Sequence, residues 1–217
     1  MTSVLVACLV AQQEPWLQRF LDRLGKLSYP QIRHAFVEGK KIPLLHQWAK
    51  AKEDTWIRES DPPITDRFDR LAYLRNLIVE EADIKEDYVL WIDCDVIEFP
   101  PNLIEDLMRH NVSVVAPGVY IEGSNHFYDT FAFRFLNEAH FPVKNNPPAG
   151  LLEVHSVGTC YLVHSSLYSQ SRVRYHGGDS EQVTFCTETR NVGGRVYVDF
   201  SIKVEHANLP KYGVNWH

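Results

Sequence analysis

Short apolar runs alternate with amphipathic segments along the first hundred residues, a pattern typical of strands and helices that follow each other in turn. Continuous apolar runs predict strands over 4–10 and 88–92, and a further strand is predicted over 32–37. Apolar side chains at helical spacing predict helices over 16–24 and 67–82. The first of these helices lies between two predicted strands and therefore predicts a βαβ unit with parallel strands.

The rest of the chain is less regular. Residues 40–65 are polar and proline-rich and are predicted to be mostly loop, with room for one short helix. Residues 120–141 are rich in aromatic side chains and show no clear period. The further elements predicted are a helix over 103–108, a strand over 112–116, a loop over 145–150, a strand over 154–163 broken at Gly158, a helix over 180–189 and a strand over 195–204.

This order of elements predicts an α/β fold with a Rossmann-like mixed sheet flanked by helices. The chain has 217 residues and is 45% hydrophobic and 23% charged, which suits one domain over 1–217 with a substantial core. We expect the domain to have two halves, about 1–100 and about 101–217.

The net charge and the cysteine pattern limit the classes of partner and the cellular compartment that we expect. The net charge is −6 and no basic block stands out, so nucleic acid is a poor candidate partner. The run over 4–10 is too short to span a membrane, and no other stretch approaches the required length, so we expect no transmembrane segment. Cys8, Cys94, Cys160 and Cys186 form no CxxC pair, which favours reduced thiols and a cytoplasmic location.

The most informative segment ends the third predicted strand with two acids. The apolar run Tyr88–Ile92 is followed by Asp93, Cys94 and Asp95. Ligands of open α/β sheets gather at the carboxyl ends of strands, and two adjacent carboxylates at a core strand require a compensating charge. A divalent cation that also contacts phosphate oxygens is the simplest candidate. An isolated Asp-x-Asp triplet is also common in surface turns, and its place at the strand end is what favours the metal.

With its surroundings, this segment resembles a known family. Residues 91–104 are similar to the metal-binding segment of GT-A fold glycosyltransferases, which use nucleotide-sugar donors. Residues 181–186 and the stretch 193–206 resemble that fold's late acidic helix, its following strand and its terminal histidine. Arg75-Asn76, Ile97–Pro101 and Val114–Pro117 are closest to the fungal mannan-polymerase mannosyltransferases.

The resemblance implies a metal-dependent hexosyltransferase that uses Mn²⁺ or Mg²⁺. Asp95 would bind the metal, Asp93 the ribose or the metal's water shell, and His206 would be a further ligand. A cation on the diphosphate stabilises the charge that the leaving group gathers. Imidazole favours Mn²⁺ over Mg²⁺. A solvated histidine in a charged tail is the alternative for His206.

Two acids near the late helix are the catalytic candidates. Glu181 matches the family's acidic position, and Asp179 precedes it by two residues. Either carboxylate could accept the acceptor's proton in an inverting reaction, or position the acceptor or the sugar in a retaining one. The family usually has Glu-Asp here, whereas this chain has Glu181-Gln182. Both acids could instead only cap the helix.

The same resemblance assigns the donor and acceptor contacts. The first predicted half would bind the nucleotide sugar, a GDP- or UDP-sugar, and the second half would bind an acceptor glycan, protein or small molecule. The alternative for Glu38 is a solvated loop acid that binds no ligand. The alternative for Arg70 is a surface ion pair. Some of the aromatic residues of 120–141 are expected to lie in the core. The donor candidates are Gln12, Glu14, Glu38, Arg70, Arg75 and Asp93, and the acceptor candidates are Tyr120 and Asp129.

Two other functions compete with glycosyl transfer. A nucleotidyltransferase on a related sheet typically has a glycine-rich basic loop after the first strand, and residues 11–14 are neither glycine-rich nor basic. A non-catalytic sugar- or protein-binding module of the same fold is the second alternative. The acids at 93 and 95 and His206 favour an enzyme, while Gln182 leaves this alternative open.

Overall fold

All named strands of the described residues join one sheet in the order β3-β2-β1-β4-β8-β6-β9-β5, with β7 paired to β9. The computed structural model describes residues 2–52, 54–129, 132–137, 139 and 150–213. The architecture is the mixed α/β sheet flanked by helices that the sequence predicts.

The first half of the chain builds the parallel side of the sheet. Strand β1 pairs in parallel with both β2 and β4, and β2 pairs in parallel with β3. Because these strands run the same way, their carboxyl ends meet at one edge. The elements are β1 (Val4–Val10), α1 (Leu17–Leu24), β2 (Ile32–Glu38), α2 (Pro43–Lys50), β3 (Thr55–Glu59), α3 (Arg67–Glu81) and β4 (Tyr88–Ile92).

The second half is mixed in direction. Strand β8 runs antiparallel to both β4 and β6, and β9 runs parallel to β6 but antiparallel to β5 and β7. The elements are β5 (Val96–Glu98), α4 (Leu103–Met108), β6 (Val114–Ile121), β7 (Leu151–Glu153), β8 (Cys160–His164), α5 (Ser166–Ser169), α6 (Glu181–Asn191), β9 (Val196–His206) and the 3₁₀ helix η1 (Leu209–Tyr212).

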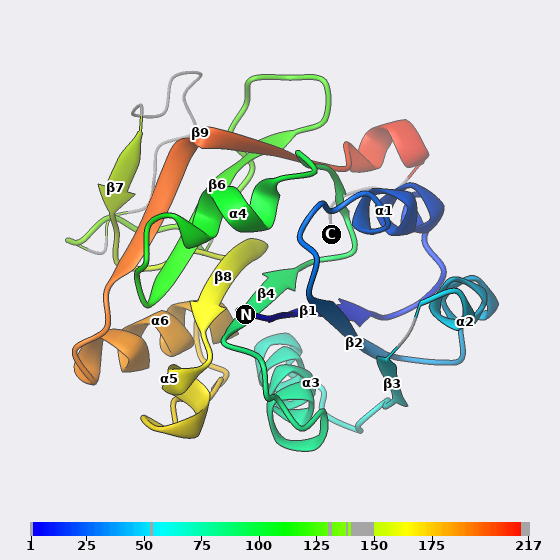
Figure 1. Ribbon diagram of the computed structural model, residues 1–217, viewed down its shortest axis with the longest axis horizontal. Helices are drawn as coiled ribbons and strands as arrows, with labels where there is room; N and C mark the ends of the chain where they lie inside the picture. Colours follow the sequence, from blue (N-terminus) through cyan, green and yellow to red (C-terminus); the bar gives the residue numbers. More distant parts are fainter. Residues whose placement is uncertain (1, 53, 130–131, 138, 140–149, 214–217) are drawn as a thin grey trace.

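Helices cover both faces of the sheet, and each face has its own apolar core. Figure 1 shows α1, α2 and α4 on one face and α3, α5 and α6 on the other. Phe20 of α1 and Leu107 of α4 belong to the first core, while Ile78 of α3 and Phe185 of α6 belong to the second. This two-sided cover explains why the central strand β4 is buried at every position.

Strand β9 changes its register against β6 part way along. Pro117 pairs with Asp199, but the next residue, Gly118, pairs with Lys203. Three residues of β9 are therefore skipped, and the pairing then continues to Ile121 and His206. Such a bulge bends the strand locally and separates two independently paired segments.

The sequence predictions are confirmed for the strands β1, β2 and β4 and for the helices α1 and α3, and are partly wrong elsewhere. A short helix does form within 40–65, as α2, but this segment also contains the strand β3, which was expected to be loop. The strand predicted over 154–163 is wrong in extent, because only β8 is a strand and Ser156 instead forms an isolated bridge with Arg134. The strands β5 and β7 and the helix α5 were not predicted.

Two further expectations concern cysteines and membranes. All four cysteines are free, and Cys8, Cys160 and Cys186 are buried while Cys94 is partly exposed. Among the described residues, every helix is too short or too polar to cross a membrane.

Candidate active site

A cavity of about 890 Å³ opens at the carboxyl ends of β1, β2 and β4. Its walls come from the ends of these strands and the segments after them, from the first half of α3, from Ile121, residues 127–129 and Ala132, and from the first turn of α6. Of the predicted site residues, Glu14, Arg70, Arg75, Asp93, Asp95, Asp129, Glu181 and His206 line it. The cavity is large enough for a small-molecule ligand and lies where open α/β sheets bind theirs.

The two acids after β4 are held by a tight turn. The Asp93 backbone N–H donates to the Thr159 carbonyl at 2.9 Å, and the Val96 N–H donates to the Asp93 carbonyl at 3.0 Å. Thr159 has a φ of +59°, which is costly for a β-branched residue. A strained residue beside β8 thus fixes the backbone from which both carboxylates enter the cavity.

Asp95 and His206 face each other at the cavity wall. The Oδ2 atom of Asp95 lies 2.9 Å from Nε2 of His206. The imidazole is 1% exposed and stacks on the Tyr128 ring, with the ring centroids 3.6 Å apart. Burial lowers the pKa of His206, but the attraction of Asp95 outweighs it, and the pKa is raised above its usual value. Without another cation, a proton on His206 is what reconciles these two groups.

The residues present fit a divalent cation as two ligands of a larger set. Nδ1 of His206 lies 2.8 Å from the Ala207 carbonyl, so an Nδ1–H donated there leaves the Nε2 lone pair for a metal. Asp95 Oδ1 is buried without a partner among the described residues. Two ligands at right angles, each roughly 2.1 Å from one ion, lie about 3.0 Å apart, close to the 2.9 Å observed here.

The protein does not supply a complete coordination shell within the described residues. They contain no cluster of three or more His, Cys, Asp or Glu side chains placed to hold a metal. A cation at Asp95 and His206 would therefore depend on water and on ligand oxygens for its other positions, as Mg²⁺ and Mn²⁺ do in phosphate-handling sites.

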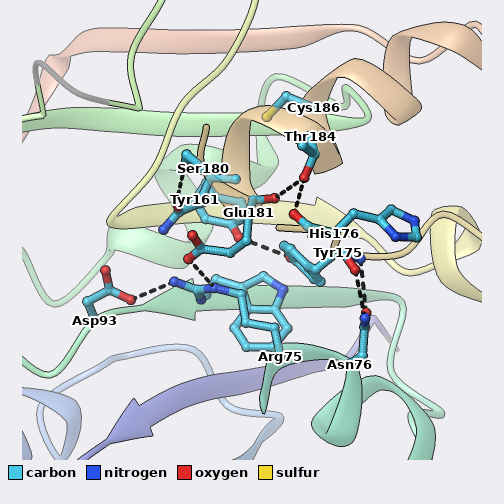
Figure 2. Close-up of polar contacts among 12 residues, drawn as sticks. Arg75, Asn76, Asp93, Tyr161, Tyr175, His176, Ser180, Glu181, Thr184 and Cys186 are labelled. Carbon is cyan, nitrogen blue, oxygen red and sulfur yellow. Dashed lines mark hydrogen bonds and ion pairs between the residues drawn. The ribbon is translucent and has the colours of Figure 1, made fainter. Parts of the chain in front are cut away.

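Arg75 joins the acid after β4 to the acid that begins α6. Its Nη2 lies 3.0 Å from Asp93 Oδ1, and its Nε lies 3.2 Å from Glu181 Oε1 (Figure 2). Arg75 is 2% exposed and Glu181 is fully buried, whereas 31% of the Asp93 side chain is open to the cavity. Burial, together with repulsion from Asp95 and Glu181, outweighs the attraction of Arg75 and raises the pKa of Asp93 to about 6.

Asp129 is buried at the cavity wall, without an ion pair among the described residues. Its Oδ2 accepts from the Gly158 N–H at 2.9 Å. Burial raises its pKa to about 7, against the lowering effect of that hydrogen bond. Tyr120, the other predicted acceptor residue, is absent from the cavity wall, and its ring packs against Phe127 instead.

Glu38 lies away from the cavity and has both oxygens engaged elsewhere. Oε2 accepts from the Ile42 N–H at 2.8 Å, at the start of α2, and Oε1 lies 2.7 Å from His46 Nε2. A buried carboxylate in this position caps the helix and pairs with a histidine one turn further on. The structure thus places Glu38 apart from the other predicted donor residues, and its ribose contact stays a prediction.

The remaining predicted residues lie at or beyond the rim. Gln12 Nε2 donates to Glu14 Oε1 at 3.0 Å, and of these two only Glu14 lines the cavity. Arg70 lines the cavity while it pairs with Asp61. Asp179 is 80% exposed and lies 3.5 Å from Arg134, outside the cavity wall, so Glu181 is the better placed of the two catalytic candidates.

Sequence reasoning missed the parts of the site that act through backbone or stacking. Thr159 contributes its carbonyl, and Tyr128 contributes a ring face to His206. The only sequence signal for the first was Gly158, which interrupts an apolar run. A Cβ at this position would lie 2.5 Å from the Ala132 Cβ, so the close approach requires glycine.

Comparison with known proteins identifies similar folds. The sequence model of the Anp1 family matches residues 40–139, less than half of the chain. S. aureus TarS 1–349 in complex with UDP-GlcNAc superposes with a TM-score of 0.67 at 12% identity, over 95% of this chain and 59% of that one. The fold is therefore shared, at a sequence identity too low to transfer an activity.

Two other structures give the same result. The mannosyltransferase PcManGT from Pyrobaculum calidifontis, in complex with GDP-Man and Mn²⁺, matches with a TM-score of 0.63 and 13% identity over 97% of this chain and 58% of that one. GalNAc-T7 with UDP, GalNAc and Mn²⁺ matches with a TM-score of 0.65 and 10% identity over 95% and 44%. The chain spans about three-fifths or less of the length of these three proteins.

Proposed function

We propose that this protein is a metal-dependent glycosyltransferase that moves a hexose from a nucleoside diphosphate sugar to an acceptor. The observation that carries the proposal is the convergence of Asp93, Asp95, His206 and Glu181 on one cavity at the strand ends. The match to the Anp1 family and the likeness to a mannosyltransferase bound to GDP-Man support it.

Each group has a distinct task in this proposal. Asp95 and His206 hold Mn²⁺ or Mg²⁺, which supplies the positive charge that a departing diphosphate requires. Asp93, partly open to the cavity, contacts the ribose or the water shell of the metal. Since the described residues leave most of the shell open, the diphosphate itself completes the site.

Glu181 acts on the acceptor side. Its Oε2 is buried without a partner among the described residues, although its other oxygen is held by Arg75. A free lone pair at a cavity wall can receive the hydrogen bond of an acceptor hydroxyl and, in an inverting reaction, its proton. Asp129 binds another hydroxyl of the acceptor. The acceptor is thus a polyol, such as a glycan.

A ligand panel tests the proposal directly. Thermal unfolding is measured with GDP, UDP, CDP and dTDP, each with and without Mn²⁺, and the best nucleotide then selects the sugar donors for a hydrolysis assay. We expect one nucleotide to raise the unfolding temperature only when Mn²⁺ is present, because ligand and metal bind the folded state together. No response to any nucleotide would overturn the proposal and favour a non-catalytic module.

A further inference from the structure

The guanidinium of Arg75 is the least exposed arginine group at the cavity, with 2% of its side chain exposed. It comes from the middle of α3 and lies between Asp93, which follows β4, and Glu181, which begins α6 (Figure 2). One cation therefore serves two carboxylates from distant parts of the chain. Because the three side chains together carry a net negative charge, Arg75 has no surplus positive charge to offer a diphosphate.

Two aromatic rings, those of Trp91 and Tyr175, fix the orientation of this guanidinium. Its central carbon lies 5.1 Å from the Trp91 ring centroid and 5.8 Å from that of Tyr175. Trp91 Nε1 donates to the Tyr168 hydroxyl at 2.8 Å, and the Tyr175 hydroxyl lies 2.9 Å from that same group. The two rings that contact Arg75 lie edge to face, with their centroids 5.4 Å apart, and are tied to each other through Tyr168, so the arginine has little freedom to swing toward a ligand.

The neighbouring residue on α3 fastens the segment that leads to Glu181. Asn76 Nδ2 donates to the Tyr175 carbonyl at 2.8 Å, and the Tyr175 N–H donates back to Asn76 Oδ1 at 2.9 Å (Figure 2). Two residues later, a Cβ on Gly177 would lie 1.7 Å from the Asp69 carboxylate, so this segment lies directly on α3. Arg75 and Asn76, which are consecutive in α3, therefore hold Glu181, the first residue of α6, and the segment that precedes it.

Two atoms of the Arg75–Glu181 pair remain available. Arg75 Nη1 and Glu181 Oε2 are buried and have no hydrogen-bond partner among the described residues, and both side chains line the cavity. A buried donor and a buried acceptor without partners are each costly, and a hydroxyl group, which both accepts and donates, suits either of them.

We infer that Arg75 is a positioning residue for Glu181 and does not bind the diphosphate. It holds Oε1 of Glu181 so that Oε2 meets the acceptor hydroxyl, and its anchor on Asp93 ties that placement to the donor side of the cavity. This role rests on the proposed glycosyl transfer. It replaces the donor-binding role that the family resemblance implies for Arg75.

The test compares Arg75→Lys with the parent protein in two separate measurements. Affinity is measured for GDP and UDP with Mn²⁺, and turnover is measured as hydrolysis of GDP-mannose, UDP-glucose and UDP-N-acetylglucosamine. A displaced Glu181 lowers kcat by about 100-fold while the nucleotide Kd changes by less than about threefold. Millimolar guanidinium should restore part of the turnover of Arg75→Ala, because it can occupy the space beside the two rings that the side chain leaves.

A double variant asks whether Arg75 acts through Glu181. In a Glu181→Gln background, Arg75→Lys should reduce kcat by less than about twofold, because the group that it positions is already lost. Arg33→Lys is the matched control. Arg33 forms a partly shielded pair with Glu86 at 2.6 Å, with side chains 15% and 9% exposed, and neither residue lines the cavity, so its turnover should match the parent.

The outcomes separate this inference from the proposed function. A parent protein that neither binds nor hydrolyses any of these nucleotides overturns both. An active parent together with a Kd that rises at least tenfold in Arg75→Lys overturns the positioning role alone and restores the diphosphate contact. Should Arg75 variants not fold, Asn76→Ala loosens the same segment without touching the guanidinium, and an unchanged kcat in that variant overturns the inference.

Discussion

Two acid–histidine pairs in this protein have nearly the same N–O distance but different surroundings. Glu38 lies 2.7 Å from His46, and Asp95 lies 2.9 Å from His206. The second oxygen of Glu38 accepts a hydrogen bond from the Ile42 N–H at the start of α2. The second oxygen of Asp95 is buried without a partner among the described residues. Completeness of hydrogen bonding, rather than burial or pairing, is what separates a structural carboxylate from one that awaits a ligand.

The largest effect should come from the pair at the cavity. Asp95→Asn keeps the shape but removes the charge that a cation needs, so turnover should fall roughly 100- to 1,000-fold and the Mn²⁺-dependent thermal shift by nucleotide should vanish. The unfolding free energy without ligand should change by less than about 1 kcal/mol. Equal nucleotide shifts in variant and parent would contradict the assignment.

His34 extends the comparison to a buried histidine without an acid. It is 6% exposed, neither ring nitrogen has a hydrogen-bond partner among the described residues, and burial lowers its pKa to about 4. In the unfolded chain this histidine takes up a proton as the pH falls through about 6.5. Above that pH the ring is neutral in both states, and its burial costs no stability through protonation. Stability should then be lost as the pH falls toward 4, by up to about 3 kcal/mol.

The control for this pH effect is His34→Phe, because the ring lies among Phe36 and Trp48 and contributes mainly packing. Urea unfolding at pH 7 and at pH 4.5 should show a smaller acid loss in the variant than in the parent. An identical loss in both would assign the acid sensitivity to other groups.

The structural pair should give the reverse of the Asp95 result. Glu38→Ala leaves the Ile42 N–H and His46 without their partner and should lower the unfolding free energy by about 2 kcal/mol, while Glu38→Gln, which keeps one acceptor, should cost about 1 kcal/mol. Nucleotide affinity of the folded variants should equal that of the parent. Lost affinity with unchanged stability would restore Glu38 as a ribose ligand.

The smallest expected effect concerns an exposed cap. Asp66 accepts from the Phe68 and Asp69 N–H groups at 2.9 Å and begins α3. Asp66→Ala should lower the unfolding free energy by about 1 kcal/mol, measured by urea unfolding. A loss greater than that of Glu38→Ala would show that burial adds nothing to the capping of α2.

The fold could be predicted where one periodicity dominates a segment. The strands β1 and β4 are apolar on both faces, β2 is apolar and buried over Ala35–Val37, and α3 carries an apolar stripe, so their patterns could be recognised. Strand β3 has the sequence TWIRE and lies at the sheet edge with no buried residue, and an edge strand of this kind has no apolar pattern to detect. The strands β5 and β7 are three residues long, too short for any period.

The site could be predicted where side chains follow strand ends. Asp93, Asp95 and His206 follow this rule and line one cavity. The position of Glu38 could not be predicted in this way, because it depends on where α2 begins and on His46. The pairing of Arg75 with Glu181 joins residues 106 positions apart, and no local pattern encodes it.

The shift of register along β9 has a consequence for how this chain could vary in length. His206 is placed by the pairing of Lys203–His206 with Gly118–Ile121, and Asp199 by its own pairing with Pro117. Residues 200–202 have no partner in β6, so a change of length there need not alter the pairing of the segment on either side. Relatives that gained or lost a residue there would keep the histidine at the cavity, while a change of length after Lys203 would turn it away.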